Sequence, residues 1–318
     1  MTILISDPRF LLHDTGRHVE TADRLRAITL RLQQTGLVER CTPLPFEPID
    51  EIAIDRVHAP DVSRLLNRLV SEGGGFADPD TVVSEESPTV AKLAAGAACA
   101  AVDAILAGQD RTALCLIRPP GHHATPERSM GFCLFNNVAL AARHALDQHQ
   151  LNRILIVDWD VHHGNGTQDI FFADPRVMFL SIHRYGHGFY PGTGAVGETG
   201  TGPGLRFTRN VPLRFGTTRD AYFDAFSQAV EQCADKIRPE LVLLSAGFDA
   251  HRLDPIGSLG LETEDYARMT EKVLEVARSH AGGRLVSCLE GGYHLAALAE
   301  STQAHLQCLL DAGEVHSR

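Results

Sequence analysis

The chain has 318 residues, of which 44% are hydrophobic and 22% are charged, and it carries a formal net charge of −11. This composition is typical of a globular protein and excludes a disordered chain of low hydrophobicity and high charge. The acidic balance also lacks the basic surface that binding to a nucleic-acid backbone requires, so we expect no nucleic-acid partner.

The first residues, the apolar runs and the cysteine spacing bear on the cellular compartment in which we expect the protein. The first residues, MTILISDPRFLLHD, lack the basic start and the long apolar stretch of a secretory signal. No apolar run reaches the roughly 18 residues of a membrane-spanning helix. We therefore expect a cytoplasmic protein without a membrane partner. The cysteines are scattered and never spaced as C-x-x-C, which predicts buried free thiols; they are Cys41, Cys99, Cys115, Cys133, Cys233, Cys288 and Cys308.

Short aliphatic runs alternate with longer helical patterns along the chain. In chain order we predict helices over 22–34 and 90–106, a strand over 113–117, a helix over 138–149, strands over 153–157 and 177–182, a helix over 219–236, a strand over 241–244, a helix over 263–279, a strand over 284–289 and a helix over 295–310. Strands that alternate with helices form a parallel sheet covered on both faces. With no repeat and no long linker, the pattern predicts a single α/β domain over residues 1–318.

Each predicted strand ends in a polar loop that contains glycine. In chain order these loops read RPPGHHA, DWDVHHGNG, HRYGHGFYPGTG, SAGFDAH and EGGYH. Ligands of open α/β sheets bind outside the carboxyl ends of the strands. We therefore expect the histidine, aspartate and tyrosine side chains of these loops to converge at one edge of the sheet.

The DWDVHHGNG loop carries the pattern of a metal site. In an extended chain Asp158, Asp160 and His162 point to the same side. Carboxylate and imidazole groups are ligands of divalent metals, and catalytic zinc keeps one position open for water. Asp249 also follows an apolar strand and is the natural third protein ligand. The alternative is a buried Asp–His pair that only ties loops together, but a second strand-end aspartate favours the metal interpretation.

Two further loops supply candidate catalytic groups. His122 and His123 follow a stiff Pro-Pro-Gly turn, so their rings point differently and can hold different protonation states. One of them could take a proton from water, while a charged neighbour assists electrostatically; ordinary loop histidines are the alternative. Tyr293 follows two glycines, and its phenol could donate to an oxyanion or merely pack.

The other histidines have no clustered partners in the sequence. We interpret them as packing or surface residues; they are His13, His58, His144, His149, His280 and His305.

Taken together, the motifs resemble the zinc-dependent histone deacetylase family, most of all its class II branch and the bacterial histone deacetylase-like amidohydrolases. The resemblance runs from HDTGRHVE at residues 13–20 to EGGYH at residues 290–294, with the other four loop motifs and GFCLFNN between them in the family's order. It departs from the family at Val19, where the family carries proline, and at Asn165, where class I enzymes carry aspartate.

The resemblance implies an arginase–deacetylase α/β fold with a central, mostly parallel sheet of about eight strands. It implies zinc held by Asp160, His162 and Asp249, with His123 as general base and later acid. His122, backed by Asp158, would be its electrostatic partner, and Tyr293 would polarise the amide carbonyl. A substrate tunnel walled by aromatic side chains is implied as well, with the substrate-binding residues Phe132, Tyr190, Ile256, Gly131 and Gly292. A structural potassium ion would lie near Asp158, Asp160, His162, Ser181 and Ile182, and an arginine below the site matches Arg24.

These expectations predict a zinc-dependent amidohydrolase that removes acetyl or other acyl groups from lysine side chains in peptides or proteins. An acetylpolyamine amidohydrolase with the same machinery is the alternative. An arginase-like manganese hydrolase would need further bridging carboxylates, and an inactive acyl-lysine reader would not need the intact catalytic set.

Ile256 bears on the choice of substrate. It follows Asp254 and Pro255. In the family the residue after this Asp–Pro pair borders the tunnel mouth, and a polyamine-selective member carries glutamate there. An isoleucine offers hydrocarbon surface to the methylene stem of lysine, each buried CH₂ contributing about 0.8 kcal/mol. It gives a substrate cation no partner. Ile256 therefore favours acyl-lysine, although the negative charge of the chain could attract polyamines elsewhere on the rim. The sequence does not indicate the oligomeric state.

Overall fold

The computed structural model describes residues 1–186 and 188–315, so His187 of the HRYGHGFYPGTG motif lies outside it. Eight parallel strands form one central sheet in the order β2-β1-β5-β10-β9-β6-β7-β8. Their bounds are β1 Thr2–Ile5, β2 Cys41–Pro43, β5 Thr112–Cys115, β6 Ile154–Asp158, β7 Val177–Arg184, β8 Thr208–Leu213, β9 Leu241–Ala246 and β10 Leu285–Leu289. The predicted α/β fold with a parallel sheet of about eight strands is confirmed.

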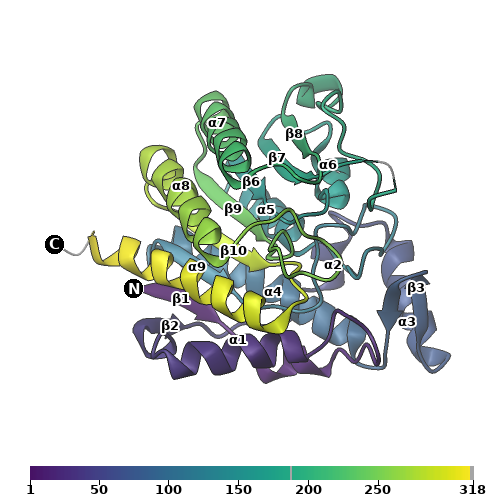
Figure 1. The fold of residues 1–318 in the computed structure, drawn as a ribbon. Helices are drawn as coiled ribbons and strands as arrows, with labels where there is room; N and C mark the ends of the chain where they lie inside the picture. The colour runs from purple at the N-terminus through teal and green to yellow at the C-terminus, as the bar shows by residue number, and fades with distance from the viewer. Residues whose placement is uncertain (187, 316–318) are drawn as a thin grey trace.

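Helices cover both faces of this sheet (Figure 1). One layer holds α1, α9, α8 and α7, which pack on one another in that order, and α4, α5 and α6 lie on the opposite face. The helices are α1 Asp23–Gln34, α2 Glu51–Ile54, α3 Pro60–Ser71, α4 Ser87–Leu106, α5 Asn137–Gln148, α6 Asn165–Phe171, α7 Arg219–Ile237, α8 Thr263–Ala281 and α9 Leu295–Val315. A separate antiparallel pair, β3 Gly75–Asp78 and β4 Thr81–Val83, lies outside the main sheet.

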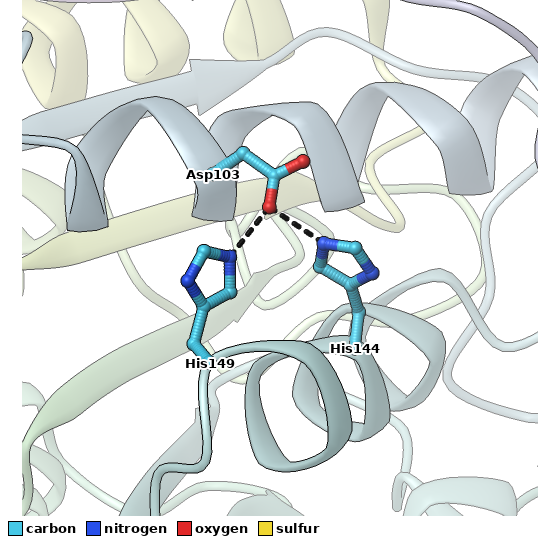
Figure 2. Close-up of side chains that lie close together, drawn as sticks. All are labelled: Asp103, His144 and His149. Atoms are coloured by element: carbon cyan, nitrogen blue, oxygen red, sulfur yellow. Dashed lines mark hydrogen bonds and ion pairs between the residues drawn. The ribbon is translucent and has the colours of Figure 1, made fainter.

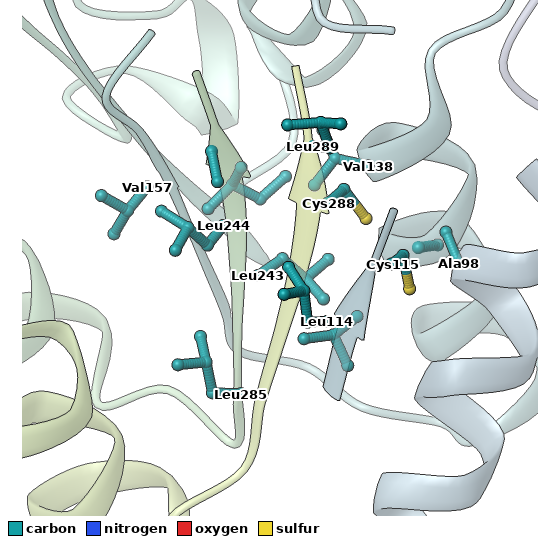
Figure 3. Close-up of a cluster of buried hydrophobic side chains, with 14 of the residues drawn as sticks. Ala98, Leu114, Cys115, Val138, Val157, Leu243, Leu244, Leu285, Cys288 and Leu289 are labelled. Carbon is teal, nitrogen blue, oxygen red and sulfur yellow. The ribbon is translucent and has the colours of Figure 1, made fainter. Parts of the chain in front are cut away.

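The core explains why the central strands read as continuous apolar runs. Every residue of β5, β6, β9 and β10 is buried, because each strand has a helix layer on both sides. Figure 3 shows the middle of this core, where side chains of β9 and β10 meet those of α4 and α5. All seven cysteines are free thiols, as predicted, and five of them are buried; Cys41 and Cys308 are only partly buried, which the sequence analysis did not expect.

Helix α4 is long and apolar enough to span a membrane by length and composition, the one such helix among the described residues. Most of it is buried inside the protein, where it packs against α5, β5 and β10. Its apolar character is therefore accounted for by its place in the core.

Several short elements escaped the sequence analysis. Strands β2 and β8 lie at the two edges of the sheet and are only partly buried, so they lack the apolar runs of the central strands. Pro212 lies inside β8, which is tolerated at an edge because an edge strand bonds on one side only. Helices α3 and α6, strand β1 and the β3–β4 pair were not expected either.

Candidate active site

The polar loops at the strand ends meet at one edge of the sheet because their strands are neighbours. In the middle of the sheet the order is β5-β10-β9-β6-β7. Leu289 at the end of β10 pairs with Ala246 at the end of β9, and Ser245 pairs with Asp158 at the end of β6. The EGGYH, SAGFDAH and DWDVHHGNG loops therefore leave the sheet side by side, with the RPPGHHA loop beyond EGGYH.

Asp160, His162 and Asp249 come together in a buried cluster at this edge. One possible ligand atom from each residue lies within 4.8 Å of the other two. His162 Nδ1 is 3.1 Å from Asp160 Oδ1 and 3.0 Å from Asp249 Oδ2. Backbone amides fix both carboxylates, since Gly291 N donates to Asp160 at 2.8 Å and Val161 N donates to Asp249 at 2.9 Å. One imidazole nitrogen between two carboxylates is a donor set that zinc accepts.

Space and charge in this cluster both fit a divalent cation. A Cβ atom on Gly247 would lie 2.1 Å from Asp160 Oδ2, and one on Gly291 would lie 2.3 Å from Asp249 Oδ2, so glycine keeps room beside each carboxylate. Burial and the neighbouring Asp160 charge raise the pKa of Asp249 to about 7. Burial alone would lower the pKa of His162, but its hydrogen bonds to both carboxylates raise it to about 9. A cation would replace the proton that these groups share.

His122 and His123 lie beside the cluster and differ in protonation. His122 Nδ1 donates to Asp158 Oδ2 at 2.9 Å, and His123 Nδ1 donates to Asn165 Oδ1 at 2.7 Å. Burial by itself lowers the pKa of His122, but the charges of Asp158 and Asp160 raise that pKa well above its usual value. Burial and the nearby positive His122 lower the pKa of His123 well below its usual value. A neutral His123 thus keeps Nε2 as a proton acceptor beside a charged His122.

Tyr293 is held in place from two sides. Its backbone amide donates to Asp254 Oδ2 at 2.8 Å, and the Arg24 guanidinium lies 5.0 Å from the centre of its ring. Arg24 also donates to the carbonyl oxygens of Gly292, at 2.7 Å, and of Glu290. Burial raises the pKa of the Tyr293 hydroxyl well above its usual value. The phenol therefore stays protonated and can donate a hydrogen bond.

A cavity of about 280 Å³ opens onto His123, His162 and Tyr293. Among the described residues, the rest of its lining is one carboxylate, Asp80, together with glycines and with aromatic and aliphatic side chains. These are Gly131, Phe132, Gly188, Phe189, Tyr190 and Ile256. The predicted residues Phe132, Tyr190, Ile256 and Gly131 therefore all line it. Asp80 and Phe189 are additions that the sequence analysis missed.

Aromatic rings make up much of the cavity wall. Phe189 stacks on the His162 ring, with centroids 5.0 Å apart and planes 1° apart. Tyr190 meets the His123 ring edge-on at 5.0 Å, and Phe132 meets the Tyr293 ring edge-on at 5.8 Å. The sequence offered a signal for Phe189, because it precedes Tyr190 directly in the GFYPGTG segment.

The two predicted glycines have different places. Gly131 has a φ of 58°, and a Cβ atom there would lie 2.5 Å from the His123 ring, so only glycine fits beside this imidazole. Gly292 has a φ of 121° and lies outside the cavity lining. It shapes the turn that presents Tyr293.

The predicted potassium ligands lie close together. Asp158 and Ser181 are register partners on β6 and β7, and Ile182 follows Ser181 in the same buried strand. Ser181 Oγ also lies 2.9 Å from His183 Nδ1. An ion at this position stays a prediction.

Three charged residues of the motifs, Glu20, Arg118 and Glu290, fix the polar loops through contacts that the sequence analysis did not predict. Glu290 Oε2 accepts from the amides of Gly121, at 2.7 Å, and of His122, at 3.2 Å. Arg118 and Glu20, both fully buried, form a bidentate salt bridge, in which Arg118 Nε donates to Glu20 Oε1 at 2.5 Å and Nη2 donates to Oε2 at 2.7 Å. These partners are distant in sequence, so no local spacing indicates them.

The remaining histidines divide into two groups. His13, His58 and His305 are buried and hydrogen-bonded, as expected of packing residues. His144, His149 and His280 are partly exposed, as expected of surface residues. His144 and His149 both contact Asp103, which is distant in sequence.

Comparison with known proteins places this architecture in a family. Residues 18–309 match the histone deacetylase domain. The chain is similar to the histone deacetylase-like amidohydrolase of Pseudomonas aeruginosa, with 38% identity over 87% of this chain and 72% of that protein. It is also 42% identical to the human polyamine deacetylase HDAC10 over 95% of this chain, but it spans only 46% of the human protein's length.

A solved structure is similar in fold as well. The crystal structure of the HDA15 HD domain matches with a TM-score of 0.92 and 37% identity, covering 98% of this chain and 88% of that chain. The motif order, the eight-stranded sheet and these matches agree. The chain belongs to the histone deacetylase family.

Proposed function

We propose that this chain is a zinc-dependent deacetylase that hydrolyses the amide of acetylated lysine side chains in peptides or proteins. Acetate and a free amine are the products. One observation supports the proposal: a cavity of about 280 Å³ with a largely aromatic lining opens onto His123, His162 and Tyr293, beside a buried donor set that fits a divalent cation. The cavity has room for a methylene stem that ends in an amide.

The residues around the cluster have distinct roles in this reaction. Zinc held by Asp160, His162 and Asp249 would polarise the substrate carbonyl and lower the pKa of water to about 7. His123 accepts the water proton at Nε2, because its Nδ1–H is held by Asn165. It then donates a proton to the leaving amine nitrogen.

His122, kept positive by Asp158, stabilises the negative charge that develops nearby. The Tyr293 hydroxyl donates to the oxyanion of the tetrahedral intermediate. Arg24 positions Tyr293 through the backbone carbonyls of its loop. We extend the proposal to a structural potassium ion at Asp158, Ser181 and Ile182, and to residues 1–318 as one cytoplasmic catalytic unit.

The cavity mouth supports lysine as the substrate. Ile256 contributes an aliphatic side chain to the cavity lining, which also contains the rings of Phe132 and Tyr190. Such a wall favours the hydrocarbon stem of lysine and offers no charge to a remote ammonium group.

Acetylpolyamine hydrolysis is the second candidate. The human relative that is 42% identical to this chain is a polyamine deacetylase. The Asp80 carboxylate also lines the cavity, and a carboxylate near a substrate cation would attract it. Both candidates use the same catalytic residues and differ in what the mouth binds.

A comparison of substrates and variants distinguishes them. We expect kcat/KM for an acetyl-lysine peptide to exceed that for acetylspermidine and acetylputrescine. Ile256→Glu should shift the ratio toward the polyamines by about tenfold, which corresponds to about 1.4 kcal/mol. Leu253→Glu is the matched control, because Leu253 is exposed on the same loop and outside the lining. A wild-type preference of about tenfold for either polyamine would make the second candidate the correct one.

A further inference from the structure

A second group of metal-binding side chains lies far from the catalytic loops in the topology. Asp103 belongs to the last turn of α4, His144 lies one turn before the end of α5, and His149 directly follows α5 (Figure 2). Both helices lead into strands of the parallel sheet, α4 into β5 and α5 into β6. Their carboxyl ends therefore lie at the edge where the strands begin, opposite the edge that carries the catalytic loops.

The three side chains point at one another in a geometry that a metal could use. Asp103 Oδ1 is 2.6 Å from Nε2 of His144 and 2.6 Å from Nε2 of His149. These ligand atoms all lie within 4.8 Å of one another. The two imidazole rings stand at 69° with centroids 5.6 Å apart, so both present Nε2 to the same carboxylate oxygen, as Figure 2 shows.

The surroundings leave the cluster accessible and add negative charge. The side chains of Asp103, His144 and His149 are 53%, 24% and 30% exposed. They line a surface hollow of about 660 Å³ together with Glu47 and Asp50. The arginines of this hollow already have partners, since Arg56 pairs with Asp147 and Arg143 pairs with Asp174. An incoming cation therefore meets open carboxylate and imidazole groups.

We propose that Asp103, His144 and His149 bind a second divalent transition-metal ion, represented by Zn²⁺, at a site separate from the catalytic cluster. Two imidazole nitrogens and one carboxylate oxygen are a common zinc ligand set, and solvent would fill the remaining position. Each histidine would bind through Nε2 as its Nδ1–H tautomer. The Nε2 to Oδ1 separations would widen to about 3.3 Å, the spacing of ligands around zinc, by small rotations of partly exposed side chains.

Zinc uptake by the tag-free enzyme, with its catalytic centre already loaded, tests the site. We expect isothermal titration with Zn²⁺ to detect one further ion in the wild type. His144→Ala/His149→Ala should bind that ion at least about tenfold more weakly. His280→Ala is the matched control, because His280 is a partly exposed histidine 3.6 Å from the carboxylate of Asp235. This control should bind as the wild type does.

Two further readouts guard against a folding defect. kcat/KM of the double variant should equal that of the wild type, because none of the three residues touches the catalytic cavity. Added Zn²⁺ should raise the Tm of the wild type and of His280→Ala, but not that of the double variant. Equal zinc uptake by the wild type and by a folded double variant would overturn the proposal.

Discussion

The two edges of the sheet carry the same ligand types in opposite environments. Asp160 and Asp249 are at most 1% exposed and receive backbone hydrogen bonds, whereas the Asp103 side chain is 53% exposed and is hydrogen-bonded to the side chains of His144 and His149. The buried carboxylates have strongly shifted pKa values in opposite directions, since that of Asp160 falls and that of Asp249 rises. Partial burial by itself would raise the pKa of Asp103, but the hydrogen bonds from His144 and His149 outweigh this effect and lower the pKa.

Burial is therefore the main difference between the proposed catalytic centre and the proposed second metal site. In the catalytic cluster the protein has removed water and fixed each ligand before any ion arrives, which strengthens the electrostatics of the site. In the Asp103 cluster water competes for every ligand, and side chains must be ordered by the ion itself. The predictions that follow test this contrast.

Among the variants that leave the proposed metal ligands intact, the largest expected effect is at Tyr293. Tyr293→Phe removes one hydroxyl donor at the buried edge and should lower kcat by roughly 10²–10³, with a much smaller change in KM. His144→Phe at the exposed edge is a control that should leave kcat unchanged. Steady-state kinetics on the preferred substrate decides the matter: an undiminished kcat for Tyr293→Phe would mean that this residue only packs.

The next effect concerns stability below the catalytic loops. Glu20 pairs with the buried Arg118 and Arg24. Burial alone would raise the pKa of Glu20, but the two arginines lower it to about 2 from its usual value of 4.5. Glu20→Gln leaves both guanidinium groups without a charged partner and should reduce the free energy of unfolding by roughly 3–5 kcal/mol at neutral pH.

The pH dependence of that loss follows from the lowered pKa. The stabilisation by ionised Glu20 is complete above pH 4.5 and is lost as the pH falls toward about 2. The gap between wild type and Glu20→Gln in denaturant unfolding should therefore narrow across this range. If the difference in unfolding free energy between wild type and Glu20→Gln stays constant with pH, the ionised pair does not provide the stability. Arg64→Ala is the control: it breaks the exposed Arg64–Asp61 pair and should change the free energy of unfolding little at any pH.

Much of the fold and the site follows from the sequence for local reasons. The central strands are recognisable because burial on both faces demands apolar residues at every position, as in β6 and β9. Parallel neighbours then bring Asp160, His162 and Asp249 to one edge, so a pattern of strand ends predicts their meeting. His123 and Tyr293 were found by the same reasoning and lie in the cavity lining.

The remaining features depend on packing that no local pattern records. Asp103 meets His144 and His149 because two neighbouring helices end at the same level, a contact across 41 and 46 residues of sequence. Glu290 reaches the His122 turn in the same way, across the boundary between β10 and β5. Edge strands such as β8 escaped because partial exposure relaxes their composition.

The central claim is that the buried cluster, and not the exposed one, is the metal centre of the reaction. Zinc content and turnover of Asp249→Ala, measured beside Asp103→Ala, test it most directly. Asp249→Ala should lose nearly all turnover and retain zinc poorly at the catalytic centre, while its fold persists by circular dichroism. Asp103→Ala should keep wild-type kcat/KM. Stoichiometric zinc at the catalytic centre with near-normal kcat in Asp249→Ala would contradict the account.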